Sequence, residues 1–185
     1  MTRPARAHIN LQALQHNFSR VQQAAPRSNI MAIIKANAYG HGLVSMAQSL
    51  PHADAFGVAC LDEAISLREA GFDRRIVLLE GLFTTEDVGL VNGYQLDVVV
   101  HHESQLLLLE QGSLLRPLDI WVKLDTGMHR LGFATESVAA VTARLRKIQQ
   151  VGAIRYMSHF PCADDLGSHS TTTQRQTFMD ALAAT

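Results

Sequence analysis

Short apolar runs alternate with longer amphipathic segments along most of this chain, and this alternation constrains the fold more than any other feature. The six runs are apolar or β-branched without strict alternation, and they span residues 30–34, 55–59, 76–79, 96–100, 118–124 and 154–157. Such runs are typical of strands covered on both faces, as in parallel sheets. Because a helical segment follows each run, the sequence predicts an α/β fold.

The helical segments carry start and stop signals of their own. Asn10 is a good N-cap residue, and the apolar residues after it recur at helical spacing, which predicts an opening amphipathic helix. The helical pattern of residues 63–70 ends at Gly71, and residues 171–185 predict a last helix. Thr84 precedes two acidic residues, and Thr135 is predicted to cap the helix that follows it.

Two architectures fit this alternation: an open doubly wound sheet and a (β/α)8 barrel. The glycine fingerprint of a dinucleotide fold is missing after the first run, where residues 38–42 read Ala-Tyr-Gly-His-Gly, and this favours the barrel. Six units occupy residues 29–185, roughly 26 residues each, so eight units would need roughly 210 residues. The sequence therefore predicts one domain, residues 1–185, that is a barrel truncated after about six units.

Composition excludes several classes of protein. Sixteen basic residues against 17 acidic ones give a net charge of −1, so no basic field favours nucleic acid as a partner. The two cysteines, Cys60 and Cys162, belong to no C-x-x-C pair, and no metal site is predicted. No apolar stretch approaches the length of a membrane span, and no signal peptide is evident. We therefore expect a soluble cytoplasmic protein.

The first run leads into a segment that could carry chemistry. Lys35 follows it directly, and the carboxyl ends of barrel strands hold the active site. A desolvated lysine there could condense with an aldehyde, whereas a solvated lysine would be structural. Tyr39 between Lys35 and a Gly40-His41-Gly42 turn could hold a phosphate or lie on the surface.

Two later segments add further candidates. The strand predicted for residues 118–124 places Trp121, Lys123 and Asp125 on one side and leads to Arg130. If Lys123, Arg130 and Asp125 share one cavity, an additional anion is needed to balance the second positive charge. In the alternative, Asp125 clamps Arg130 and Lys123 points outward into solvent. His159 follows the sixth run, where it could stack on a flat cofactor or be a core histidine.

Taken together, three segments resemble one family, the alanine racemases. They are Ala32-Ile-Ile-Lys-Ala-Asn-Ala-Tyr-Gly-His-Gly42, Lys123-Leu-Asp-Thr-Gly-Met-His-Arg-Leu-Gly132 and Met157-Ser-His-Phe160. The likeness is colinear and covers nearly the whole chain. It implies the amino-terminal part of a PLP-binding TIM-type barrel, with the family's carboxyl-terminal β domain absent, and a homodimer in the full-length form.

The resemblance also implies roles for individual residues. Lys35 would hold pyridoxal 5'-phosphate covalently and act as one of two bases that exchange the α-proton of alanine. Tyr39 would bind the cofactor phosphate, Arg130 would lie beside the phenolic oxygen, and His159 would lie against the pyridine ring. Lys123 matches a lysine that many members carry as a carbamate paired with that arginine, and Met128 and Arg130 are candidates for substrate contact.

Some features depart from the family or leave the activity open. Pro161 stands where the family usually has a small residue, and the opposing tyrosine base would lie beyond Thr185. The expected activity is interconversion of L- and D-alanine, either supplying peptidoglycan precursors or catabolising D-alanine. The alternatives are a PLP-binding fragment without activity, another PLP barrel enzyme (a broad-specificity racemase, decarboxylase or aldolase) and a cofactor-free Schiff-base aldolase.

Overall fold

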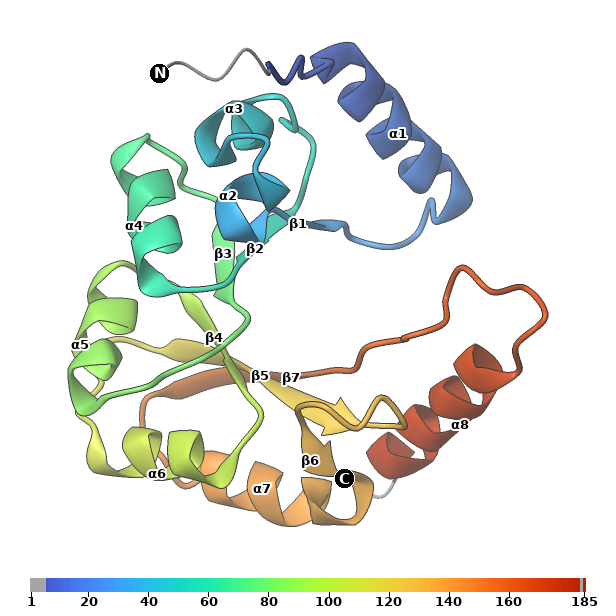
Figure 1. Cartoon of the computed structure of the whole chain (residues 1–185). Coiled ribbons are helices and arrows are strands. Elements are labelled where there is room, and N and C mark those ends of the chain that lie inside the picture. Colours follow the sequence, from blue (N-terminus) through green and yellow to red (C-terminus); the bar gives the residue numbers. More distant parts are fainter. Residues whose placement is uncertain (1–5, 184) are drawn as a thin grey trace. The chain divides into compact units, whose positions relative to one another are not determined.

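A computed structural model describes residues 6–183 and 185, which form two compact units divided between Ile76 and Val77. Figure 1 shows the helices and strands of both units. In both units parallel strands are joined by helices, as the sequence predicts. Among the described residues, no helix is both long and apolar enough to cross a membrane.

The first unit contains the opening helix and two complete strands. Its elements are α1 (Leu11–Ala24), β1 (Met31–Ile33), α2 (Lys35–Tyr39), α3 (Leu43–Gln48), β2 (Ala55–Val58) and α4 (Leu61–Glu69), with the start of β3 (Arg75–Leu78). The Asn10 side chain caps α1 by accepting a hydrogen bond from the Ala13 amide, which confirms the predicted start of this helix. β1 and β2 pair in parallel with Ile33 opposite Gly57.

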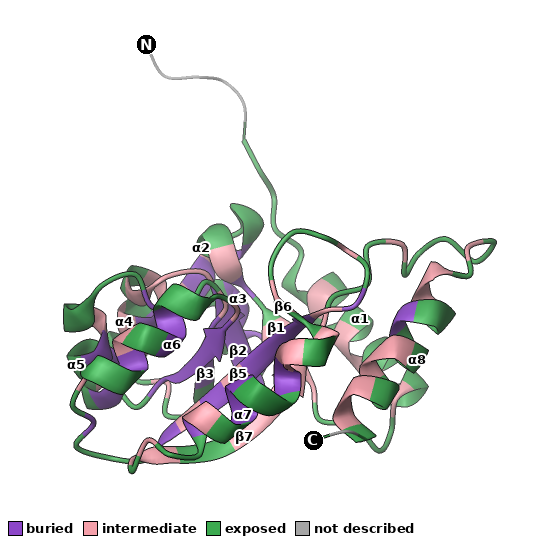
Figure 2. Cartoon of the chain, turned by 90° about the horizontal axis from the view of Figure 1, so that it is seen from below, coloured by how far each residue is buried: buried purple, intermediate pink, exposed green. Residues whose placement is uncertain are grey.

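The core of the first unit lies around β2, whose four residues are all buried (Figure 2). The Phe56 ring meets Phe72 edge to face with centroids 5.7 Å apart, and the Arg74 guanidinium lies 5.5 Å from the Phe56 centroid. The same guanidinium donates to the carbonyls of Pro51 and Ala53 at 2.9 and 2.6 Å. These contacts fix the chain on both sides of β2.

The second unit continues the alternation from β3 onward. Its elements are α5 (Thr85–Gly93), β4 (Asp97–Val100), α6 (Glu103–Gln111), β5 (Leu118–Asp125), β6 (Phe133–Ala134), a 3-10 turn (Thr135–Ser137), α7 (Val138–Leu145), β7 (Val151–Met157) and α8 (Ser170–Ala183). β4 pairs with β3 and β5, and β5 also pairs with β7, all in parallel. Parallel pairing brings the carboxyl ends of these strands to one edge of the sheet.

The predicted capping residues begin their helices with one exception. Thr84 and Asp87 form the capping box at the start of α5, with the Asp87 carboxylate accepting from the Thr84 amide at 2.9 Å. The prediction that Thr135 caps a helix is wrong: Thr135 lies inside the 3-10 turn, and its hydroxyl donates to Glu136. The two-residue strand β6 was not predicted, because two residues carry no periodicity.

Not every predicted strand is covered on both faces. β4 is buried throughout, whereas β7 is only partly buried and Ile33 in β1 is 41% exposed. Among the described residues, β1 pairs with β2 alone and β7 with β5 alone. The less buried strands are therefore the ones with a single neighbour.

Candidate functional site

Lys35 lies immediately beyond the β1 ladder and is half-buried. The Ile34 amide extends the ladder by donating to the Gly57 carbonyl at 2.9 Å, so the backbone is held by the sheet up to the residue before Lys35. This is the position at the carboxyl end of the first strand that the sequence predicts. Lys35 is thus partly covered at the carboxyl end of a strand, where barrel enzymes carry their active sites.

The turn after Lys35 is left-handed. Ala36, Asn37, Ala38 and Tyr39 have φ between 52° and 54° although none of them is glycine. An L-residue in this region costs roughly 1–2 kcal/mol, so four in succession persist only where their surroundings hold them. Nothing in the sequence analysis predicted this turn, because the composition of the segment does not distinguish it from a right-handed one.

Hydrogen bonds within the segment hold part of the turn. The Asn37 carbonyl accepts from the Gly42 amide at 3.0 Å, and the Asn37 side-chain oxygen accepts from the Leu43 amide at 2.8 Å. Gly40 and Gly42 have φ of 84° and 98°, which confirms that the glycines allow the tight turn before α3. Tyr39 is 60% exposed, so its phenol is accessible to a ligand.

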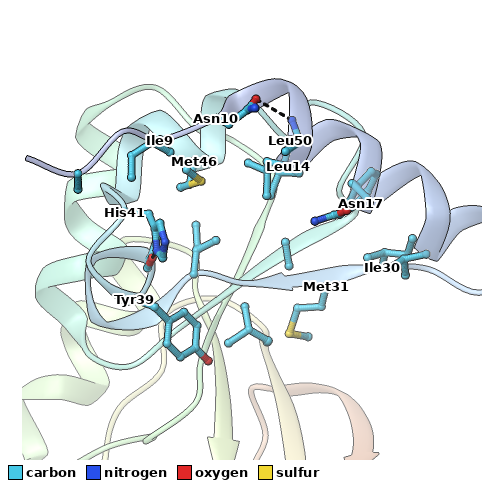
Figure 3. Close-up of a pocket in the computed structure, with 18 of the residues that line it drawn as sticks. Ile9, Asn10, Leu14, Asn17, Ile30, Met31, Tyr39, His41, Met46 and Leu50 are labelled. Atoms are coloured by element: carbon cyan, nitrogen blue, oxygen red, sulfur yellow. Dashed lines mark hydrogen bonds between the residues drawn. The ribbon is translucent and has the colours of Figure 1, made fainter. Parts of the chain in front are cut away.

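An apolar groove of about 870 Å³ lies in the same unit, between α1 and β1. Figure 3 shows Leu14 of α1 on one side, Met31 on the other and Tyr39 at one end. The helix α1 has no buried residue, and its apolar stripe faces this groove. Lys35 does not line the groove, whereas Tyr39 and His41 do.

In the second unit, Lys123 lies within β5 and is only 8% exposed. The alternative that this side chain points outward into solvent is therefore wrong. Its strand neighbours Val122 and Leu124 are buried, whereas Trp121 and Asp125 are partly exposed. A charged ammonium at such a site is costly to bury unless other groups compensate its charge.

The loop after β5 carries Met128 and Arg130, and Asp125 organises it. The Asp125 carboxylate accepts from the amides of Gly127 and His129, both at 3.0 Å, and lies 3.1 Å from the His129 imidazole. The alternative in which Asp125 clamps Arg130 is thus corrected: its partner is His129, while Arg130 is exposed. Burial opposes ionisation of Asp125, but these hydrogen bonds lower the pKa of its carboxyl overall.

Gly132 closes this loop against β5. It has a φ of 132°, and a Cβ there would lie 2.6 Å from the Asp125 amide nitrogen. A side chain would therefore collide with backbone that cannot give way. The close approach allows β6 to pair with the end of β5, with Leu124 opposite Phe133.

His159 follows β7 and is exposed, so the alternative of a core histidine is wrong. The neighbouring Ser158 hydroxyl donates to the Leu124 carbonyl at 3.0 Å and lies 2.7 Å from the Thr126 hydroxyl. Gln174 of α8 is 2% exposed and donates to the Thr126 hydroxyl and the His159 carbonyl at 3.2 and 3.1 Å. Sequence reasoning missed Gln174, because a lone glutamine on a helix gives no sign that it is buried.

These contacts predict the effect of removing Gln174. We expect Gln174→Ala to lower the free energy of unfolding by about 1–3 kcal/mol, since it leaves buried groups without their donor. Gln176→Ala is the matched control, because Gln176 is exposed on the same helix and its amide donates to the Asp180 carboxylate. Urea unfolding measures both; equal stability of the two variants would contradict a bridging role for Gln174.

His101, just beyond β4, adds a pH-sensitive group. Burial lowers the pKa of its imidazole, and the hydrogen bond to the Glu80 carbonyl acts in the opposite direction. Its Nε2 lies 3.0 Å from that carbonyl, and its buried Nδ1 has no hydrogen-bond partner among residues 6–183 and 185. The folded chain prefers the neutral imidazole, so its stability falls as the pH drops below the ordinary histidine range.

The structure groups the predicted residues within each unit. Lys35 and Tyr39 share one turn at the carboxyl end of β1. Lys123, Met128, Arg130 and His159 lie on or just beyond β5 and β7, which pair with Lys123 opposite Met157. The carboxyl ends of these paired strands place the two loops side by side, where Gln174 joins them.

Comparison with known proteins decides the family. The model of the alanine racemase N-terminal domain matches residues 9–185. The chain belongs to the alanine racemase family. Alanine racemases from Shewanella sp. (strain MR-4) and Vibrio cholerae are each 48% identical to it, over 94% and 95% of this chain and 49% of their own length. The chain therefore spans about half the length of these racemases.

Solved structures agree with the fold. The biosynthetic alanine racemase of Pseudomonas aeruginosa is 39% identical with a TM-score of 0.88, covering 93% of this chain and 48% of the racemase. The alanine racemase of E. faecalis is 34% identical with a TM-score of 0.89, covering 99% and 51%. These likenesses confirm the predicted TIM-type barrel fold, of which this chain forms the amino-terminal part.

Proposed function

We propose that this chain is the cofactor-binding part of an alanine racemase, which interconverts L- and D-alanine with pyridoxal 5'-phosphate. The observation that carries the proposal is Lys35, a half-buried lysine held at the carboxyl end of β1 by a left-handed turn. Relatives named alanine racemase, 48% identical, support the substrate. The cytoplasmic location and the homodimer of the full-length form belong to the same proposal.

The donor set fits this cofactor chemically. Lys35 offers an amine to the cofactor aldehyde, and the accessible phenol of Tyr39 offers a donor to its phosphate. In the second unit, Arg130 would offer a cation for the cofactor's phenolic oxygen and His159 would offer a flat ring for its pyridine face, as the family resemblance implies; both side chains are exposed. When bound, pyridoxal phosphate supplies the electron sink that makes the α-proton of an amino acid acidic.

Lys35 would move a proton at the Cα atom on one face of the substrate. Racemisation also needs an acid–base group on the other face, and none of the residues proposed here is assigned to it. We propose that this group comes from the half of the racemases that the present chain does not span. The 185 residues by themselves would then bind cofactor without racemising alanine.

Titration with pyridoxal phosphate tests this proposal. We expect a saturable absorbance band of lysine-bound cofactor, which borohydride reduction and peptide mass mapping place on Lys35. No band at saturating cofactor would refute the proposal and favour an aldolase without cofactor. A histidine racemase from Leuconostoc mesenteroides is 27% identical with a TM-score of 0.81, so rates with alanine and histidine should be compared in an extended chain.

We also propose that Lys123 carries a carbamate, which would pair with Arg130. The low exposure of Lys123 supports this, because a buried charge needs a partner of opposite sign, and a carbamate could pair with the Arg130 cation where an ammonium could not. Removing carbon dioxide, or lowering the pH, should then weaken cofactor binding severalfold, and added bicarbonate should restore it. Intact-mass analysis under native conditions should show one carbon dioxide bound. Unchanged cofactor affinity and an unmodified mass would contradict the carbamate.

A further inference from the structure

The Glu63 carboxylate joins the backbone of two loops in the first unit. One of its oxygens accepts from the Asn37 amide at 2.7 Å, and the other accepts from the Ala59 amide at 2.9 Å. Asn37 belongs to the left-handed turn after β1, and Ala59 follows β2. One side chain thus holds the carboxyl-terminal loops of two paired strands.

Helix capping explains only one of these two bonds. Glu63 is the third residue of α4 after the N-cap Cys60, a position from which a glutamate commonly reaches back to amides at the helix start. The bond to Ala59, next to Cys60, resembles such a cap. The bond to Asn37 spans 26 residues and does nothing for the start of α4.

The effect of that second bond falls on Lys35. On one side the backbone is held by the sheet, through the bond from the Ile34 amide to the Gly57 carbonyl. On the other side the backbone is held at Asn37, two residues after Lys35, because the Asn37 amide donates a hydrogen bond to the Glu63 carboxylate. A left-handed turn of residues other than glycine relaxes when such ties are removed, because each residue prefers the right-handed region. Relaxation of the turn would change the direction in which the Lys35 side chain extends from the end of β1.

We propose that Glu63 is a positioning residue for Lys35: its carboxylate holds the left-handed turn and thereby aims the lysine amine. The consequence for cofactor binding rests on the proposed function of Lys35. The effect on the backbone does not, so the two can be tested separately.

Hydrogen exchange in the cofactor-free chain tests the backbone part. We expect Glu63→Ala to speed exchange of the Asn37 and Ala59 amides at least roughly tenfold, since a hydrogen bond to a charged acceptor is lost at each. Glu63→Asp separates the two bonds, because the shorter side chain keeps the acceptor near the helix start and no longer reaches Asn37. Asp62→Ala is the matched control, removing a carboxylate from the same helical turn. Unchanged exchange at Asn37 in Glu63→Ala and Glu63→Asp would overturn the proposal.

The reaction of Lys35 with pyridoxal phosphate tests the positioning part. Glu63→Asp should keep α4 and the thermal stability near those of the parent, yet slow the appearance of the cofactor band at least roughly tenfold and shift its pH midpoint. A purely structural role would leave the rate and the midpoint unchanged in the folded fraction. Faster exchange at Asn37 with an unaltered cofactor reaction would overturn the positioning role.

If the parent chain forms no cofactor band, the proposed function is refuted, but the proposed role of Glu63 in holding the left-handed turn is not. In that case trinitrobenzenesulfonate labelling of Lys35, measured relative to the exposed Lys147, replaces the cofactor as the probe. We expect the Lys35 to Lys147 labelling ratio to change severalfold in Glu63→Asp and to stay constant in Asp62→Ala. A constant ratio in both would overturn the proposal.

Discussion

Lys35→Ala is expected to remove the lysine-bound cofactor band completely, the largest single-residue effect in this chain. The physical reason is that the covalent link requires an amine at the end of β1, and no other lysine lies in the first unit. In a chain extended to the full length of the racemases, the same change should lower alanine racemisation by roughly 10²–10⁴ or more. Absorbance titration and a racemisation assay measure the two effects.

Lys147→Ala is the control for Lys35→Ala, because Lys147 is exposed beyond the end of α7. It should leave both the band and the rate near those of the parent chain. Thermal unfolding should show that Lys35→Ala is folded, since Lys35 makes no contribution to the core. A persisting band in Lys35→Ala, or its loss in Lys147→Ala, would show that the cofactor lysine has been misassigned.

The second large effect concerns self-association. Strands β1 and β7 each pair with a single strand among the described residues. A parallel barrel built for eight strands does not close with β1 to β5 and β7, and the two-residue β6 pairs with the end of β5. The open edges of β1 and β7 present unpaired amide and carbonyl groups, and β1 adds the apolar groove beside α1. We expect the 185-residue chain to aggregate, or to pair with another copy or with the remaining half, rather than to persist as a monomer.

Sedimentation of two proteins tests this expectation: the 185-residue chain, and the same chain joined to the carboxyl-terminal half of the Shewanella relative. The joined protein should be well behaved and racemise alanine, while the short chain should associate and be slower by roughly 10²–10⁴. Ile33→Lys, which puts a charge on the exposed edge of β1, should reduce association of the short chain. A monodisperse short monomer with full rates would overturn the argument.

Secondary structure was predictable because its signals are local. The runs 55–59 and 96–100 became β2 and β4, since apolar β-branched residues favour buried strands wherever the chain takes them. Asn10 and Thr84 began helices because their side chains satisfy amides a few residues away. The prediction for Thr135 failed because the start of the following helix depends on where β6 ends. The position of β6 is set by its pairing with the end of β5, which is distant from any local signal.

The sequence predicted candidate site residues, but it did not predict how the backbone and side chains around them are arranged. The three motifs identified the family, and in the structure Lys35 and His159 follow β1 and β7 while Lys123 lies within β5. The alternative that paired Asp125 with Arg130 was wrong. The sequence could not distinguish Arg130 from His129 as the partner, because both follow Asp125 within a few residues. Only the folded loop shows that its carboxylate meets the His129 imidazole.

By itself, the sequence determined the order of strands and helices, the family and the candidate cofactor residues, because these depend on periodicity, capping and short motifs. Only the tertiary structure decided how those residues are held. The left-handed turn after Lys35 depends on Glu63, 26 residues away, and the His159 loop depends on the buried Gln174 of α8. Both are hydrogen bonds between segments distant in sequence, and such contacts exist only once the sheet has brought the segments together.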